Sequence, residues 1–162
     1  MPGKIEIISI EKQEDMQIII GHAGFIKTAE DLYEAMVGSV PGVKFGLAFV
    51  EASGECLVRS EGNDNEMKKL AENAAFKIAA GHTFIIIFKG AYPINVIKSI
   101  RDVPEVAEIY CATANPVKVL TVSDSYGTAV IGVIDGSRAK GIETSNDKAK
   151  RRKLLRDIGY KM

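Results

Sequence analysis

The sequence predicts a mixed α/β (α+β) fold, a mixed β-sheet with helices packed on it. Several short runs rich in β-branched residues are typical of strands, and the segments between them repeat apolar residues at helical spacing. The chain has 162 residues, a length that suits one domain with a sizeable core. No internal repeat or low-complexity tract divides it, so residues 1–162 are interpreted as a single domain.

The N-terminal segments predict a hairpin followed by a helix. Residues 5–10 and 16–20 are rich in isoleucine and are joined by the charged turn EKQED, a pattern that favours two paired strands. From Thr28, a residue type that can cap a helix, apolar residues recur at near-helical spacing. Pro41 and Gly42 then end the helix.

A second hairpin and a second helix are predicted next. The runs KFGLAFVEA and ECLVRSE are separated by Ser53 and Gly54, which suit a turn. Asn63 or Asp64 then caps a helix that carries one apolar stripe. Gly81 is well suited to the left-handed residue that ends such a helix.

In the second half of the chain, predicted strands and helices continue to alternate. The run TFIIIF at residues 83–88 is continuously apolar, which indicates a strand covered on both faces. Pro93 and Asn95 open a shorter helix, and another strand starts at residue 106. The runs VKVLTVS and TAVIGVIDG predict a hairpin around the turn DSYG. A polar loop follows, and the last helix starts at about Asp147.

The composition indicates a soluble protein whose overall charge does not favour binding to nucleic acid or to an anionic membrane. Twenty-one basic residues balance 21 acidic ones, so no overall field attracts nucleic acid or an anionic membrane. The first residues lack the apolar stretch of a signal peptide, and no apolar run is long enough to span a membrane. We therefore expect a cytoplasmic location. Cys56 and Cys111 lie in strand-like runs and are interpreted as buried free thiols, with a disulfide as the less favoured alternative.

The common nucleotide-binding motifs are missing from the sequence. The segment GSRAKGIE resembles a P-loop only superficially, and no G-x-G-x-x-G follows an expected strand. A turn at residues 135–141 could bind an anion through its amides, although an ordinary surface loop is the favoured interpretation. The basic run KAKRRKLLRD could bind an anion or nucleic acid, but a solvated helix face is favoured.

The chain's two histidines stand in different contexts. His22 follows an expected strand and precedes Ala23 and Gly24, so we expect it in an exposed turn. His82 stands between Gly81 and the apolar run, at the mouth of a buried strand. An imidazole can act there as a base or as a nucleophile toward phosphorus, and a hydrogen-bonded structural histidine is the alternative.

Long segments of the chain resemble the adenosine-specific kinases, a family of small archaeal and bacterial proteins. The resemblance is carried by SVPGVKFGLAF, AAGHTFIIIFKGAYPINV, VPEVAEIYCATANPV, GVIDG and RRKLLRDIGYKM. It implies an α/β subunit that assembles as a homotrimer, a site for adenosine or AMP, and a histidine that holds phosphate, mapped here onto His82. Relatives often carry a histidine where this chain has Gly24, and an arginine where it reads SYGTA.

The resemblance implies a kinase that transfers a phosphoryl group from a nucleoside triphosphate such as ATP to adenosine, giving AMP. Charge neutralisation is expected from Mg²⁺ together with Lys44, Lys89 or Arg152, because these cations lie beside expected strand and helix ends. Asp64 could orient the hydroxyl group or the metal, and no residue is assigned as a metal ligand. A non-catalytic adenosine- or AMP-binding module and a structural trimer without a nucleotide site are the alternatives.

Overall fold

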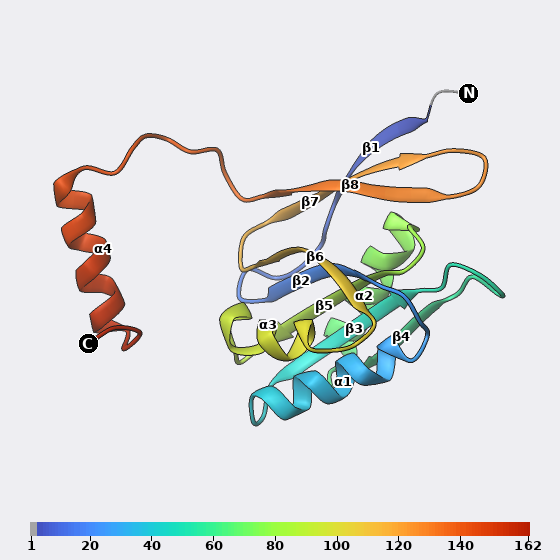
Figure 1. Ribbon diagram of the computed structural model, residues 1–162, viewed down its shortest axis with the longest axis horizontal. Coiled ribbons are helices and arrows are strands. Elements are labelled where there is room, and N and C mark those ends of the chain that lie inside the picture. Colours follow the sequence, from blue (N-terminus) through green and yellow to red (C-terminus); the bar gives the residue numbers. More distant parts are fainter. Residues whose placement is uncertain (1–2) are drawn as a thin grey trace.

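A five-stranded antiparallel sheet forms the centre of the computed structural model, which describes residues 3–162 (Figure 1). Its strands, in spatial order, are β4 (Val58–Gly62), β3 (Lys44–Val50), β5 (Thr83–Lys89), β2 (Gln17–Ala23) and β6 (Val106–Thr113). Both sheets of the structure are antiparallel throughout, whereas the sequence predicted one mixed sheet. The mixed α/β class itself is confirmed.

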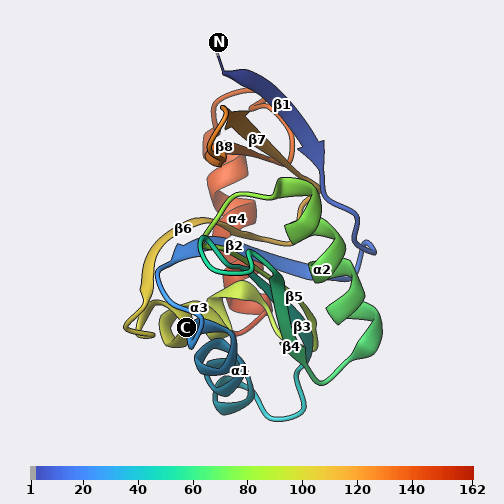
Figure 2. The same cartoon turned by 90° about the vertical axis from the view of Figure 1, so that its right-hand side faces the viewer.

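Helices cover both faces of this sheet (Figure 2). On one face α1 (Thr28–Ser39) and α3 (Pro93–Arg101) pack over an apolar cluster that includes Phe45, Phe49 and Phe84. On the other face α2 (Asn65–Ile78) packs over a second cluster that contains the alternate isoleucines of β5. Six of the seven β5 residues are consequently buried, which confirms the prediction of a doubly covered strand.

A second, smaller sheet consists of β1 (Lys4–Ser9), β7 (Val117–Ser123) and β8 (Thr128–Asp135). The inner side of this sheet joins the α2 cluster through Val117, Val119 and Val133. The predicted hairpin of residues 5–10 with 16–20 is therefore wrong, because β1 pairs with β7 while β2 pairs with β5 and β6. Both segments have strong strand propensity, and propensity does not specify which partner a strand takes.

The chain ends in a helix that stands apart from both sheets. Residues 136–144 form no helix or strand, and α4 (Ser145–Asp157) follows them (Figure 1). Thr144 caps α4 by accepting the Asp147 N–H at 3.3 Å, so the helix starts two residues before the predicted position. No residue of α4 is buried. No helix of the described part of the chain is long and apolar enough to cross a membrane.

The other helix ends differ in detail from the sequence prediction. Asp64 caps α2, as expected, by accepting the Met67 N–H at 3.0 Å. The left-handed residue that follows α2 is Ala79 with φ 52°, not Gly81. Thr28 does not cap α1, because its side chain is fully buried and its hydroxyl makes no cap hydrogen bond.

The two cysteines are free, and only one of them is buried. Cys111 lies inside the sheet, where burial and the nearby Asp135 carboxylate raise the pKa of its thiol to about 11. Cys56 is exposed in the loop between β3 and β4, so the expectation of a second buried thiol is wrong. The run around Cys56 resembles a strand, but β4 starts only at Val58.

Gly46 allows a close approach between β3 and α2. A Cβ atom at this position would lie 2.0 Å from the Lys68 backbone nitrogen of α2. We expect Gly46→Ala to lower the free energy of unfolding by at least about 3 kcal/mol, because backbone atoms must move apart. Chemical denaturation followed by circular dichroism measures this change.

Gly38 of α1 provides the matched control. A Cβ atom there would meet nothing within 4 Å, so Gly38→Ala should stabilise the helix by about 0.5 to 1 kcal/mol. If Gly46→Ala were as stable as the wild type, α2 would not pack on β3 as closely as described.

Candidate functional site

His82 is the point at which three strands of the large sheet meet. Its backbone N–H donates to the Val50 carbonyl of β3 at 2.7 Å, and its carbonyl accepts the Ala23 N–H of β2 at 2.9 Å. The φ angle of His82 is 65°, in the left-handed region that non-glycine residues seldom adopt. Strained residues of this kind persist where the surrounding structure fixes them, and they cluster at functional sites.

The His82 ring lies between two other rings. It is stacked on Phe49 with 5.9 Å between the ring centroids and an interplanar angle of 19°. The ring of His22 meets it edge-on, at a centroid distance of 5.7 Å and an angle of 74°. Both histidines are half-buried, and the His82 ring has an aromatic neighbour on two sides.

His22 is therefore not in an exposed turn, as the sequence suggested. Strand β2 continues to Ala23, so His22 is a strand residue that pairs with Thr83 on β5 and with Glu108 on β6. The predicted strand stopped at Ile20 because glycine follows it. Two neighbouring imidazoles give the site both a nucleophile and a group that can accept a proton.

An ion pair on the neighbouring strands was also missed by sequence reasoning. Arg59 of β4 lies directly opposite Phe49 of β3, and its Nη2 is 2.9 Å from Glu51 Oε1. The other Glu51 oxygen accepts the Leu57 N–H at 2.9 Å. Both contacts lower the pKa of Glu51 below its ordinary value, and the hydrogen bond from the Leu57 N–H is the larger of the two causes. Opposite charges on either side of a predicted hairpin loop were the available signal for this pair.

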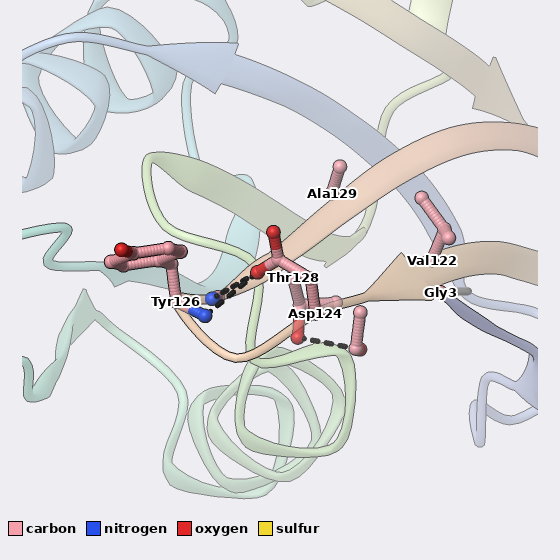
Figure 3. Close-up of a pocket in the computed structure, with 8 residues that line it drawn as sticks. Gly3, Val122, Asp124, Tyr126, Thr128 and Ala129 are labelled. Atoms are coloured by element: carbon pink, nitrogen blue, oxygen red, sulfur yellow. Dashed lines mark hydrogen bonds between the residues drawn. The ribbon is translucent and has the colours of Figure 1, made fainter. Parts of the chain in front are cut away.

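Two cavities flank the turn between β7 and β8, close to the end of the large sheet that carries His82. One, of about 440 Å³, is lined by Glu51, Gly81, Phe76 and Tyr126 among others, and it borders the backbone just before His82. The second, of about 430 Å³, is shown in Figure 3. There the Asp124 carboxylate accepts the N–H groups of Tyr126 and Gly127, so this charge closes the turn.

Three of the predicted site residues lie at the opposite end of the sheet from His82. Lys44 and Lys89 pair with each other across β3 and β5, and the Asp64 N–H donates to Phe45 beside them. Strand β5 separates this end from His82 by roughly 20 Å, at about 3.3 Å per residue. Lys89 is also engaged by Asp15, at 3.1 Å.

The fourth predicted cation, Arg152, is exposed on α4, and that helix buries none of its residues. Within one chain, therefore, the structure does not bring Lys44, Lys89, Asp64 or Arg152 together with His82. Nor do the described residues include any group of three or more His, Cys, Asp or Glu side chains that could hold a metal ion.

Comparison with known proteins decides the family. A sequence model described as adenosine specific kinase matches residues 8–161. The chain belongs to the adenosine-specific kinase family. The match includes both histidines, Arg59 and Glu51, so the whole His82 site lies within the family domain.

A solved structure shows the same fold. The PH1918 protein from Pyrococcus horikoshii OT3 is 48% identical in sequence, with a TM-score of 0.95, and the alignment covers 99% of each chain. The comparison with curated proteins finds no match. The family assignment therefore gives an adenosine-kinase-like function, and the chemistry must be argued from the site.

The left-handed backbone at His82 predicts different effects for two substitutions. Asparagine adopts this conformation with less strain than alanine. Both variants lose the ring packed on Phe49. We expect the His82→Asn protein to be more stable than the His82→Ala protein, with a free energy of unfolding larger by about 1 kcal/mol. Urea denaturation measures the difference, and an alanine variant as stable as the asparagine variant would contradict the backbone geometry.

Proposed function

We propose that this chain transfers a phosphoryl group from a nucleoside triphosphate to the 5′-hydroxyl of adenosine, giving AMP, with His82 as the transient carrier. Family membership supports adenosine as the acceptor. The observation that carries the proposal is the placement of His82, whose backbone is held by two hydrogen bonds and whose ring lies between Phe49 and a second imidazole. A cytoplasmic location is part of the proposal, because the triphosphate donor is available there.

The proposed reaction has two displacements. A ring nitrogen of His82 attacks the γ-phosphorus, the bond from phosphorus to the bridging oxygen breaks, and the nucleoside diphosphate leaves. The other ring nitrogen keeps its proton, so His82 is regenerated as a neutral imidazole when the P–N bond breaks in the second step. In the second step the 5′-oxygen of adenosine attacks phosphorus, the P–N bond breaks, and His22 accepts the hydroxyl proton directly or through one water.

Phosphoryl transfer also needs its negative charge to be neutralised. Mg²⁺ usually reaches such sites bound to the phosphates of the substrate, with several of its own waters. We propose this route here, since the chain offers no cluster of metal ligands among its described residues. Lys44, Lys89, Asp64 and Arg152 can contribute at His82 only if a neighbouring subunit brings them there.

The placement of those cations favours one alternative. A chain whose lysines lie far from His82 could bind adenosine or AMP without turnover, as a non-catalytic module. Phosphorylation of His82 would then be incidental or regulatory.

A homotrimer is the proposed assembly, and the C-terminal arm (residues 136–162) supports self-association. The side chains of Leu154 and Ile158 are 56% and 55% exposed, so the apolar side of α4 has no full cover within the chain. The arm carries nine basic and three acidic residues, hence a net charge of +6, and the remaining twelve basic and eighteen acidic residues give −6. An arm of this charge is attracted to the acidic body of another copy.

Incubation with adenosine and ATP labelled at the γ-phosphate tests the reaction. We expect labelled AMP, together with a protein label that is stable in alkali and lost in acid, because P–N bonds hydrolyse in acid. His82→Asn should lose both products while keeping its fold and most of its affinity for adenosine. Chromatography and calorimetry measure these outcomes.

The same experiment separates the alternatives. Adenosine binding without AMP formation would favour the binding module, and the absence of both would leave a structural protein. Label that persists in His82→Asn but disappears in His22→Asn would show that His22 is the carrier.

Sedimentation equilibrium at micromolar concentration tests the assembly. We expect the mass of three chains for the wild type. The double substitution of Leu154 and Ile158 by serine should give monomers, because it removes the exposed apolar side of α4. Lys148→Gln is the control on the same helix, and a monomeric wild type would refute the trimer.

A further inference from the structure

We propose that Arg59 is the phosphate-binding residue of the His82 site and that Glu51 positions it. The inference rests on the proposed phosphoryl transfer to His82 and adds the cation that this reaction requires. Neither residue was selected from the sequence. Both follow from the arrangement of β4, β3 and β5.

The strand register places Arg59 on the same face of the sheet as Phe49, the residue whose ring is stacked on that of His82. Arg59 is directly opposite Phe49, and Phe49 is directly opposite Phe84. Side chains of directly opposed residues project from the same face of an antiparallel pair and lie close together. Phe49 is therefore the common neighbour of Arg59, which is opposite it on β4, and of the His82 ring, which is stacked on it.

The Arg59 guanidinium keeps hydrogen-bond donors for an additional anion. An arginine side chain has five N–H donors in a planar fork. One terminal nitrogen, Nη2, contacts Glu51 at 2.9 Å, and the side chain is 37% exposed, so the terminal nitrogens are the donors that a phosphate can reach. The Nε is enclosed and has no hydrogen-bond partner. Such a fork matches phosphate oxygens in geometry as well as charge.

Glu51 holds this guanidinium in one orientation. Its side chain is only 13% exposed, and its carboxylate is fixed by the Leu57 N–H on one oxygen and by Arg59 on the other. The pKa of Glu51 lies below its ordinary value because of these two contacts, so the carboxylate remains charged at neutral pH. An arginine held in this way does not have to be ordered when phosphate arrives.

A second carboxylate, Glu55, can give way to the incoming phosphate. It lies 3.8 Å from Arg59 Nη2, and its side chain is 77% exposed. Exposed ion pairs of this kind contribute little energy, so replacing this contact by phosphate is inexpensive.

Lys27 also lies near the end of the large sheet that carries His82, but its ammonium group is already paired with two carboxylates. Its ammonium group contacts Asp31 at 2.6 Å and Glu105 at 2.8 Å. Arg59 has one close carboxylate contact, to Glu51, while its contact with the exposed Glu55 is 3.8 Å long, so it has more capacity than Lys27 to bind a phosphate.

The test compares Arg59→Gln and Arg59→Lys with Arg101→Gln, an exposed arginine at the end of α3. We expect Arg59→Gln to slow the labelling of His82 about 100-fold, as does the loss of one preorganised donor in other enzymes. Arg59→Lys should recover only part of the rate, because lysine keeps the charge and loses the fork. Calorimetry should show weaker binding of ATP and of inorganic pyrophosphate, unchanged adenosine binding, and wild-type behaviour for Arg101→Gln.

Glu51→Gln separates positioning from binding. Its amide oxygen can still accept the Leu57 N–H, but the charge that orients Arg59 is lost. We expect slower labelling, by about 10-fold, with little change in adenosine affinity.

Each outcome bears on one of the two proposals. An Arg59→Gln protein that binds pyrophosphate and acquires label as the wild type does would overturn the role of Arg59. A wild-type protein without any label would overturn His82 as the carrier. Loss of pyrophosphate binding in Arg59→Gln would in that case still support Arg59 as a phosphate-binding residue.

Discussion

The burial of β5 on both faces is the constraint from which the rest of the structure follows. Thr83 to Phe88 are fully enclosed, so β5 needs a strand on each side to satisfy its backbone groups. Strands β3 and β2 fill these positions, and helices then cover the two faces. The same arrangement brings Val50 and Ala23 to the start of β5, where they bond the backbone of His82.

The site is a consequence of how the chain enters β5. Helix α2 ends at Ile78, and only four residues lead from it into the buried strand. Two of them, Ala79 and His82, adopt left-handed conformations, each of which costs about 1 to 2 kcal/mol for a residue other than glycine. The two backbone hydrogen bonds of His82, worth about 1 kcal/mol each, offset this cost at the histidine. The backbone of His82 is therefore fixed by the fold before any ligand arrives, and its ring is packed between Phe49 and His22.

Local signals in the sequence were enough to predict most elements, but not the contacts between them. The apolar run of β5, the Asp64 cap of α2 and the turn between β7 and β8 all act over a few residues, and the structure confirms them. The partner of β1 depends on a strand more than a hundred residues away. His22 is likewise brought to His82 by the pairing of β2 with β5, two strands that are distant in sequence. Arg59 is brought opposite Phe49 by the predicted hairpin, but its role depends on the contact of Phe49 with His82, which is not local. Family resemblance identified His82 but did not point to Arg59 or Glu51.

The predicted cations show why charge beside a strand end is a weak indicator of a site. Strand ends emerge from the core, so charged side chains gather there for solvation whether or not they bind a ligand. Lys44 and Lys89 are directly opposed, an arrangement that is unfavourable for like charges unless other groups compensate. Asp15 and Gln13 compensate Lys89, so this lysine has a structural explanation. Arg59 differs because its guanidinium is oriented by a fixed carboxylate and retains a buried donor without a partner, a combination that solvation alone does not explain.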